Sequence, residues 1–347
     1  MDRTISFMAA INQLGYGIVG SNLAASLAKK CKLSIFEIGS NNIKLNQYSA
    51  KSPSVKLWHQ WDLFNHVGSL RVGFPIFELD RFTELEKASL LSQDIILVAS
   101  NWAKNIVEDQ TGHEHVRVVP LACDKNIFKS RPELGMDGNT TKFLNVGKWE
   151  VRKGHDFIIR AFCQAFDKND KVELIMNCDN PCFSTKEEYI RYNNQWESYY
   201  MKYKPEMAHK ITIISNRLET QYEVADLMNS VDCGIFPARA EGWNLDLFEM
   251  MSIGKPCITT NFSAHTEYVN KANALLIDID KTESAYDGIW FKNQGNWAEL
   301  GDAQLEQCVN HMRKIHLTKQ QTGATLKLEP LDGYSWDLSA NRILSYV

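Results

Sequence analysis

The sequence lacks the features that mark several classes of protein. No run of about 18 apolar residues is present, so no segment is expected to cross a bilayer as a helix. The formal net charge is -4, and the missing basic surplus argues against a general nucleic-acid binder. The first residues, MDRTISFMAAINQLG, carry one arginine and a short apolar patch, which is a poor signal peptide and a better first β-strand.

The cysteine pattern argues against a disulfide-stabilised protein. The chain has 8 of them, with no CxxC pair, and only Cys178 and Cys182 stand close together. This pattern favours reduced, mostly buried thiols over a disulfide framework. We therefore expect a cytoplasmic protein, and contact with a membrane surface stays open.

What the chain does have is length and a regular alternation of elements. Its 347 residues exceed the size of one hydrophobic core, and 44% hydrophobic with 23% charged residues is typical of a globular protein. Alternating strand and helix patterns predict parallel sheets covered by helices. The predicted strands are 4–11, 33–38, 54–58, 71–77, 94–99, 116–121, 143–146, 172–176, 211–215, 233–237 and 256–260. The predicted helices include 21–30, 82–91, 102–110 and 155–166.

A break in this alternation divides the chain. The segment KSRPELGMDGNTTK gathers Pro132, Gly135 and Gly138, as linkers do, and the strand–helix rhythm restarts after it. We predict an α/β fold of two Rossmann-like, doubly wound domains, 1–138 and 139–330, facing each other across a cleft. Ligands should then bind at the carboxyl ends of the strands.

Residues 184–204, STKEEYIRYNNQWESYYMKYK, interrupt the rhythm with one long helical pattern. A capping box of Thr185 and Glu188 opens it. Five aromatic residues then follow at helical spacing: Tyr189, Tyr192, Trp196, Tyr199 and Tyr203. We favour an inserted helix that docks this stripe on the second domain, with an acceptor or partner surface as the alternative.

Two glutamates in AEGWNLDLFEMMSIGKP indicate a binding site. Asn244 is a good N-cap for a helix through Met251, so Glu241 lies on the preceding loop and Glu249 inside the helix. Free N–H groups near Trp243, Asn244 and Leu245 can hold a phosphate or its sugar. A carboxylate on each side of such a helix start can accept hydrogen bonds from the diols of a nucleotide sugar.

A diphosphate leaving group also needs cations. The segment GKWEVRKGHD follows a predicted strand and supplies Lys148, Arg152 and Lys153 after Gly147. Cations aimed at developing phosphate charge are typically a large electrostatic contribution to such a transfer. Because both segments follow strands of one domain, we expect them to meet.

The pattern E-G-x-x-L-x-x-x-E followed by M-x-x-G-K-P, with the upstream G-K…K-G loop, resembles retaining nucleotide-sugar glycosyltransferases of family four, which have the glycosyltransferase-B fold. FELDRF, SNWAKNIVEDQTG, VRVVPLACDKNIF and YSWDLSANRIL extend the resemblance over nearly the whole chain. It implies that Glu249 binds the donor ribose, Glu241 the transferred sugar, and Lys148 and Lys153 the diphosphate. The last helix, within 331–347, would cross back to the first domain. From its place on the same loop, Arg152 is a further donor-binding candidate.

The same resemblance implies a reaction class. A hexose would pass from a nucleotide-diphosphate sugar, most simply a UDP- or GDP-sugar, to an acceptor hydroxyl with retention of configuration and no metal. The acceptor could be a carbohydrate, a glycolipid or a protein. Three departures stand out: Lys148 replaces the usual arginine, Trp243 and Asn244 replace the commoner Phe-Gly, and Asp246 adds a negative charge near an anion site.

A rival interpretation comes from the first domain. Gly15, Gly17 and Gly20 form G-x-G-x-x-G, with Glu37 about 20 residues on, which matches a dinucleotide-binding fingerprint. An NAD(P)-dependent Rossmann oxidoreductase therefore stays possible, as does a catalytically inactive nucleotide-sugar-binding protein. In the glycosyltransferase interpretation, Gly17 and Gly20 would instead approach a substrate phosphate.

The acceptor side offers weaker candidates. His59 in KLWHQWDLF and Glu78 in FPIFELDRF both follow predicted strands and could orient the acceptor. Glu267 in SAHTEYV could line the nucleotide pocket or be a solvated loop acid. His113 and His115 have ligand-like spacing but no third partner nearby, so we predict no metal there.

Overall fold

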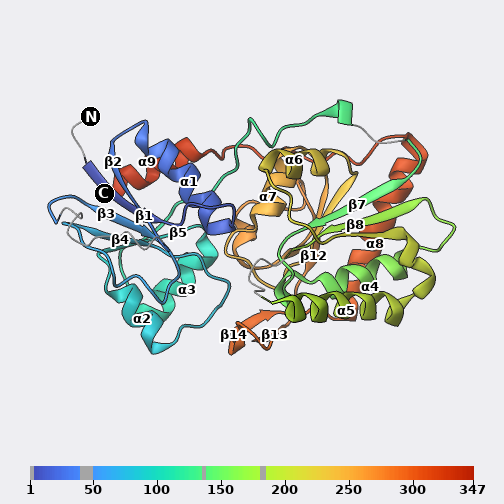
Figure 1. Ribbon diagram of the computed structural model, residues 1–347, viewed down its shortest axis with the longest axis horizontal. Coiled ribbons are helices and arrows are strands. Elements are labelled where there is room, and N and C mark those ends of the chain that lie inside the picture. Colours follow the sequence, from blue (N-terminus) through green and yellow to red (C-terminus); the bar gives the residue numbers. More distant parts are fainter. Residues whose placement is uncertain (1–3, 40–49, 135–137, 180–184) are drawn as a thin grey trace.

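The chain forms two lobes, each built on a six-stranded parallel sheet (Figure 1). This computed structural model describes residues 4–39, 50–134, 138–179 and 185–347. Helices cover the sheets, so the predicted α/β fold of two Rossmann-like domains is confirmed.

The first sheet has the strand order β2-β1-β3-β4-β5-β6. Its strands are β1 (Thr4–Ala9), β2 (Lys32–Glu37), β3 (Ser54–Leu57), β4 (Arg71–Phe74), β5 (Ile95–Val98) and β6 (Val116–Val118). The helices of this half are α1 (Gly15–Ala28), α2 (Glu84–Leu91) and α3 (Asn101–Thr111). Every strand predicted here is confirmed, with bounds that differ by a few residues. Ile5, Phe7 and Val55 are fully buried in the core of this lobe.

The second sheet has the order β12-β11-β10-β7-β8-β9. Its strands are β7 (Thr141–Val146), β8 (Val172–Asn177), β9 (Ile211–Ile214), β10 (Cys233–Phe236), β11 (Cys257–Asn261) and β12 (Leu275–Asp278). Its helices are α4 (His155–Ala165), α5 (Lys186–Tyr203), α6 (Gln221–Asn229), α7 (Leu245–Ser252) and α8 (Asp302–Thr322). Short 3₁₀ helices span Pro132–Leu134, Val151–Lys153, Pro205–Lys210 and Ser263–Glu267.

The helix predicted at 184–204 is confirmed as α5, which packs against α4. The N–H of Glu188 donates to Thr185 Oγ1 at 3.2 Å, as the predicted cap requires. The side chains of Tyr189, Tyr192, Trp196 and Tyr199 lie outside what the structure describes.

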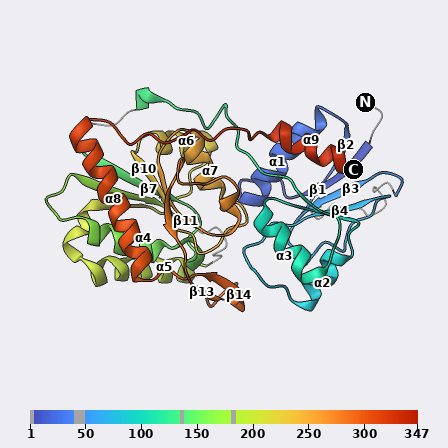
Figure 2. The same ribbon diagram turned by 180° about the vertical axis from the view of Figure 1, so that it is seen from behind.

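A second chain crossing joins the lobes near the C-terminus. Helix α9 (Trp336–Tyr346) lies beside α1, at the far end of the molecule from α8, as Figures 1 and 2 show. Ser339 Oγ donates to the carbonyl of Pro120 at 2.6 Å, and Ile343 is fully buried. The last helix thus belongs structurally to the first lobe.

A β-hairpin makes a third link between the lobes, and the sequence did not predict it. It consists of β13 (Thr282–Tyr286) and β14 (Lys292–Ala298), paired antiparallel, and it lies between the lobes in both views. Asn296 donates through its backbone N–H and its Nδ2 to the two oxygens of Asp80, at 2.7 and 3.1 Å. Trp297 Nε1 donates to the carbonyl of Glu78 at 3.1 Å. We call these contacts of residues 294–297 with 78–81 the interdomain clasp.

The clasp requires glycine at one position. Gly295 has φ +73°, and a Cβ there would lie 2.5 Å from Asp80 Oδ1. The indole of Trp297 is buried together with Leu79 and Ala240. Because Ala240 precedes Glu241 and Leu79 follows Glu78, this small core ties a loop of each lobe to the other.

The described cysteines are free and buried, which agrees with the expectation of reduced thiols; Cys182 lies outside the described residues. Within the described ranges, no helix combines the length and the apolar character needed to cross a membrane.

Candidate active site

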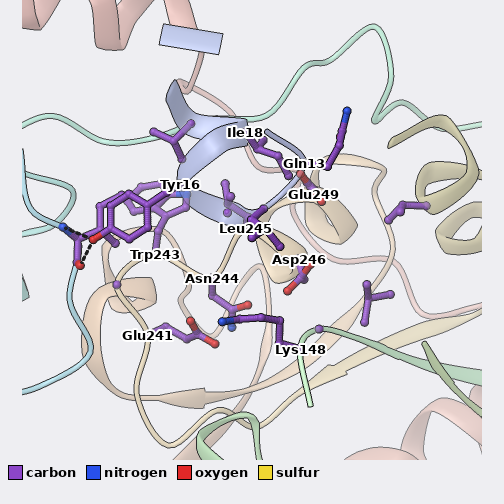
Figure 3. Close-up of a pocket in the computed structure, with 18 of the residues that line it drawn as sticks. Gln13, Tyr16, Ile18, Lys148, Glu241, Trp243, Asn244, Leu245, Asp246 and Glu249 are labelled. Atoms are coloured by element: carbon purple, nitrogen blue, oxygen red, sulfur yellow. Dashed lines mark hydrogen bonds between the residues drawn. The ribbon is translucent and has the colours of Figure 1, made fainter. Parts of the chain in front are cut away.

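A cavity of about 460 Å³ lies between the two lobes and is lined by both. Its size falls in the range of small-molecule sites. The lining includes Glu78, Lys148, Lys153, Glu241 and Glu249, so the structure brings together most of the residues predicted from sequence. Figure 3 shows how residues of α1 and of the α7 region face one another across it.

The loop after β10 places the first glutamate. Glu241 is 4% exposed, and its N–H donates to Ser263 Oγ at 2.9 Å. The hydroxyl of Tyr268 donates to the carbonyls of Trp243 and Asn244, at 2.7 and 3.0 Å. The loop is therefore held rigidly from behind, away from the cavity.

Helix α7 begins where the loop ends. Asn244 caps it through Oδ1 and has φ +69°, a left-handed conformation that asparagine tolerates better than other residues with a side chain. This explains why asparagine can stand where the resembled family has glycine. Its buried Nδ2 has no hydrogen-bond partner among the described residues, although Asn244 lines the cavity.

Arg152 is the centre of a buried ionic network. Its Nη1 lies 2.8 Å from Glu241 Oε2 and donates to the carbonyl of Ala240 at 2.7 Å. Its Nη2 lies 2.9 Å from Glu150 Oε2 and 3.7 Å from Glu78 Oε1. Arg152 therefore connects the Glu241 loop of the second lobe to Glu78 of the first, across the boundary between the lobes.

The network fixes the charge of its members. Burial alone would lower the pKa of Arg152, but the surrounding carboxylates outweigh it and raise the pKa. Burial alone would raise the pKa of Glu150, but the neighbouring Arg152 and Lys148 outweigh this effect and lower the pKa to about 2. Glu241 likewise has a lowered pKa, since Arg152 and Lys153 more than offset its burial. All three stay ionised at neutral pH.

Lys153 joins the two acids nearest to α7. Its Nζ lies 2.9 Å from Glu241 Oε1 and 3.2 Å from Asp246 Oδ2. Burial lowers the pKa of Lys153, and the two carboxylates more than reverse this effect, so the ammonium stays charged. The carboxylate of Asp246 thus pairs with Lys153, the cation that a bound phosphate would be expected to contact.

Glu249 lies deeper, and among the residues that the structure describes it has no ion-pair partner. It is 4% exposed, and its burial, with repulsion from Asp246, raises its pKa well above the ordinary value. Lys148 is more accessible, and its Nζ lies 2.7 Å from Glu150 Oε1. Near α7, the described part of the cavity lining thus holds Glu249 as a buried acid with no ion-pair partner and Lys148 as a partly exposed cation paired with Glu150.

The wall contributed by the first lobe is aromatic. Tyr16, Trp58 and His59 line it, with ring centroids 4.6 to 5.3 Å apart. The hydroxyl of Tyr16 donates to the carbonyl of Ile76. Glu78 completes this wall, and its burial raises its pKa, although Arg152 partly counteracts the effect.

Three predicted residues are absent from the cavity lining. Glu267 instead accepts from the N–H and Nδ2 of Asn101 at 2.8 to 3.1 Å, at the start of α3. Gly17 and Gly20 serve close packing: a Cβ on either would lie 2.2 Å from atoms of Asn12 or Ala10. Their neighbours Gly15 and Tyr16 line the cavity.

Sequence reasoning missed many lining residues of both lobes. In the first lobe they include Asn12, Gln13, Tyr16 and Trp58. In the second lobe, after β8 and β9 and in α6, they include Asn177, Asp179, Arg217, Leu218, Thr220, Gln221 and Val224. Their position after strands was the available signal. Tyr268, which holds the Glu241 loop, is marked by no local pattern, because its contact with Trp243 arises only in the folded chain.

Comparisons with known proteins bear on the fold and on residues 140–290. Residues 140–290 match the family model described as Glycosyl transferases group 1. No curated protein sequence gives a significant match. The structure resembles a sucrose-phosphate synthase from Thermosynechococcus elongatus, with a TM-score of 0.67 and 14% identity over 99% of this chain and 94% of that chain.

Two further structures are similar at lower identity. One is an α,α-trehalose-phosphate synthase (UDP-forming) from Burkholderia xenovorans in complex with glucose-6-phosphate, with a TM-score of 0.63 and 9% identity over 99% of each chain. Another, described as trehalose-6-phosphate from E. coli bound with UDP-2-fluoro glucose, has a TM-score of 0.64 and 8% identity over 99% and 98%. The fold is that of glycosyltransferase-B proteins, and the family match supports a glycosyltransferase.

Proposed function

We propose that this protein transfers a hexose-type sugar from a UDP- or GDP-sugar to an acceptor hydroxyl, with retention of anomeric configuration and without a metal. The observation that carries the proposal is one interdomain cavity in which Glu241 and Glu249 flank the start of α7 beside Lys153. The family match over 140–290 covers these residues.

The donor can be placed by charge. Glu249 would accept hydrogen bonds from the ribose diol, and Glu241 would accept them from hydroxyls of the transferred sugar. Lys153 and Lys148 would contact the diphosphate, together with the N–H groups at the start of α7 and the unpartnered Nδ2 of Asn244. Gly147 lines the cavity beside them, where its lack of a side chain leaves room.

The reaction needs no protein nucleophile. The bond between the anomeric carbon and the phosphate oxygen breaks, and the leaving phosphate oxygen takes the proton of the acceptor hydroxyl. The acceptor oxygen then bonds to the anomeric carbon on the face the phosphate leaves. Lys153 stabilises the charge that develops on the leaving group, a contribution of about 2–4 kcal/mol for one such contact.

An oxidoreductase is the less favoured alternative. Of the fingerprint residues, Gly17, Gly20 and Glu37 do not line the cavity, and Glu37 is exposed at the end of β2. The loop from Ala10 to Leu14 also separates β1 from α1.

An inactive sugar-nucleotide binder differs from our proposal only in turnover. We further propose a cytoplasmic location, and a carbohydrate, glycolipid or protein as acceptor.

A thermal-shift screen tests the donor. The wild-type protein is mixed separately with UDP-, GDP-, ADP- and dTDP-sugars and with NADH. A ligand at about 100 times its Kd stabilises the fold by about 2.7 kcal/mol, which gives a clear rise in Tm. We expect a UDP- or GDP-sugar to give that rise and NADH to give none. A shift with NADH alone would reject the proposal.

Donor turnover then separates an enzyme from a binder. Release of the nucleoside diphosphate is followed for the wild type and for Glu249→Ala. We expect release with the wild type and none above background with the variant. Donor binding without release in any acceptor mixture would favour the inactive binding protein.

A further inference from the structure

The two walls of the cavity differ in charge, and this difference bears on the acceptor. Resting on the proposed function, we propose that the acceptor is an uncharged carbohydrate that binds against Tyr16, Trp58 and Glu78, rather than a sugar phosphate. The relevant wall is the one that the first lobe contributes.

All the cationic side chains that line the cavity, within the described residues, come from the second lobe. They are Lys148, Arg152, Lys153 and Arg217. Arg152 and Lys153 are buried among carboxylates, and Lys148 pairs with Glu150. Arg217 donates to the carbonyl of Gln13 on the opposite lobe. None of the four is a free cation facing an acceptor.

The imidazole of His59, on the wall that the first lobe contributes, does not supply a positive charge either. Burial, with repulsion from Lys148, lowers the pKa of His59 to about 4. At neutral pH His59 is therefore an uncharged ring. A phosphate monoester carries close to two negative charges at that pH and would gain no ion pair on this wall.

Glu78 offers no positive charge to a phosphate and can accept a hydrogen bond from a hydroxyl. Its carboxylate lies 3.7 Å from Arg152 Nη2, and its side chain is 28% exposed, so it can reach solvent in the cavity. A carboxylate accepts hydrogen bonds from sugar hydroxyls, but its negative charge does not attract an anion. Asn12 and Gln13, also in the lining, add neutral amide groups.

The aromatic side chains supply the surface on which a sugar ring can pack. Tyr16 and Trp58 have centroids 5.3 Å apart, and both line the cavity. Outside them, Trp61 stacks on His59 at 5.7 Å with an interplanar angle of 13° and is 48% exposed. Apolar faces combined with a few polar groups are the usual composition of a site that orients a neutral ligand.

The acceptor class is tested with matched pairs. The donor that gives the largest thermal shift is incubated with glucose, fructose or mannose, and separately with the 6-phosphate of each. Products are measured by mass spectrometry, and kcat/KM is compared within each pair. We expect a neutral sugar to exceed its phosphate by at least about tenfold, which corresponds to about 1.4 kcal/mol.

Equal or better use of a phosphate overturns the proposal. So does transfer to neither member while the donor still shifts Tm. Loss of the donor shift itself would instead reject the proposed function, so the two failures are distinguishable.

Two variants sharpen the result. Trp58→Ala should raise the KM for the neutral sugar by about tenfold while the donor shift stays within experimental error. Trp290→Ala is the control, because Trp290 is 60% exposed and does not line the cavity. His59→Arg, which adds a cation to the wall, should improve use of the sugar phosphate. No improvement in a variant that still binds donor would count against the charge argument.

Discussion

On the wall of the cavity formed by the second lobe, Arg152 and Lys153 are buried among carboxylates and joined to them at 2.8 to 3.2 Å. On the facing wall, Tyr16 and Trp58 present aromatic rings with Glu78 beside them. The first wall holds its charges before any ligand arrives, which suits stabilisation of a leaving group. Within the described residues, Glu78 is the one charged side chain of the second wall, and its neutral polar and aromatic surroundings suit orientation of a hydroxyl. After the roles proposed above, we call the first the donor wall and the second the acceptor wall. The four predictions that follow test this contrast.

The largest effect is expected from the donor wall. Lys153→Ala removes the cation beside Glu241 and Asp246, so the leaving phosphate loses one preorganised contact. We expect kcat/KM to fall by about 10²–10³, equivalent to about 2–4 kcal/mol. Steady-state assays measure it, with Lys171→Ala, an exposed residue before β8, as the control. Turnover within about threefold of the wild type would show that Lys153 does not act on the leaving group.

Lys153 also illustrates what the sequence can and cannot reveal. Its loop, the Glu241 loop and α7 were predicted because glycine, asparagine and strand patterns mark them locally. The ion pairs of Arg152 with Glu150 and Glu78 depend on where distant loops meet, and no local pattern encodes that.

The hairpin of β13 and β14 was not predicted, for a related reason. Its second strand, KNQGNWA, has positive φ at Asn293 and Gly295, so its pattern resembles a loop. Its hydrogen bonds to Asp80 and Glu78 lie on the other lobe, and residues 292–298 alone cannot reveal them. By contrast, the buried parallel strands were predictable because each is a short apolar run that ends at turn residues.

The second prediction concerns the uncompensated acid of the donor wall. The pKa of Glu249 is raised by burial, so the folded protein binds this proton more tightly than the unfolded chain does. The stabilising contribution of the protonated form is present at acid pH and is lost as pH rises from the unfolded pKa through the folded one. Glu249→Gln should therefore raise the free energy of unfolding at about pH 8 by about 1–3 kcal/mol, and by less at about pH 4.

Urea unfolding at both pH values measures this difference, with donor affinity recorded alongside. We expect the stabilised variant to bind donor more weakly, because the amide cannot accept from both ribose hydroxyls as a carboxylate does. Glu306→Gln, on the exposed face of α8, is the control. A variant that is less stable at the higher pH would contradict the assignment of Glu249 as an unpaired buried acid.

Asp246 gives the third prediction. Its carboxylate contacts Lys153 at 3.2 Å, where a donor phosphate would bind. Asp246→Asn removes the competing charge, so affinity for the nucleoside diphosphate should rise by about tenfold, or about 1.4 kcal/mol. Calorimetric titration measures it. Asp302→Asn, an acid in the first turn of α8, provides the matched control. A fall in affinity would mean that Asp246 contacts the donor favourably.

The smallest effect is expected at the interdomain clasp, where the two walls are held in register. Trp297→Phe keeps an aromatic ring against Phe291, whose centroid lies 4.7 Å away, but it removes the N–H that donates to the carbonyl of Glu78. Loss of one hydrogen bond should lower the free energy of unfolding by about 0.5–1.5 kcal/mol.

Because that bond holds the backbone of Glu78, the acceptor KM should rise severalfold while the affinity for donor stays unchanged. Trp290→Phe, in the exposed turn of the same hairpin, should change neither quantity. If donor affinity and acceptor KM changed together in Trp297→Phe, the clasp would set the distance between the walls rather than the position of Glu78. The hairpin would then have to be counted as part of both the donor wall and the acceptor wall.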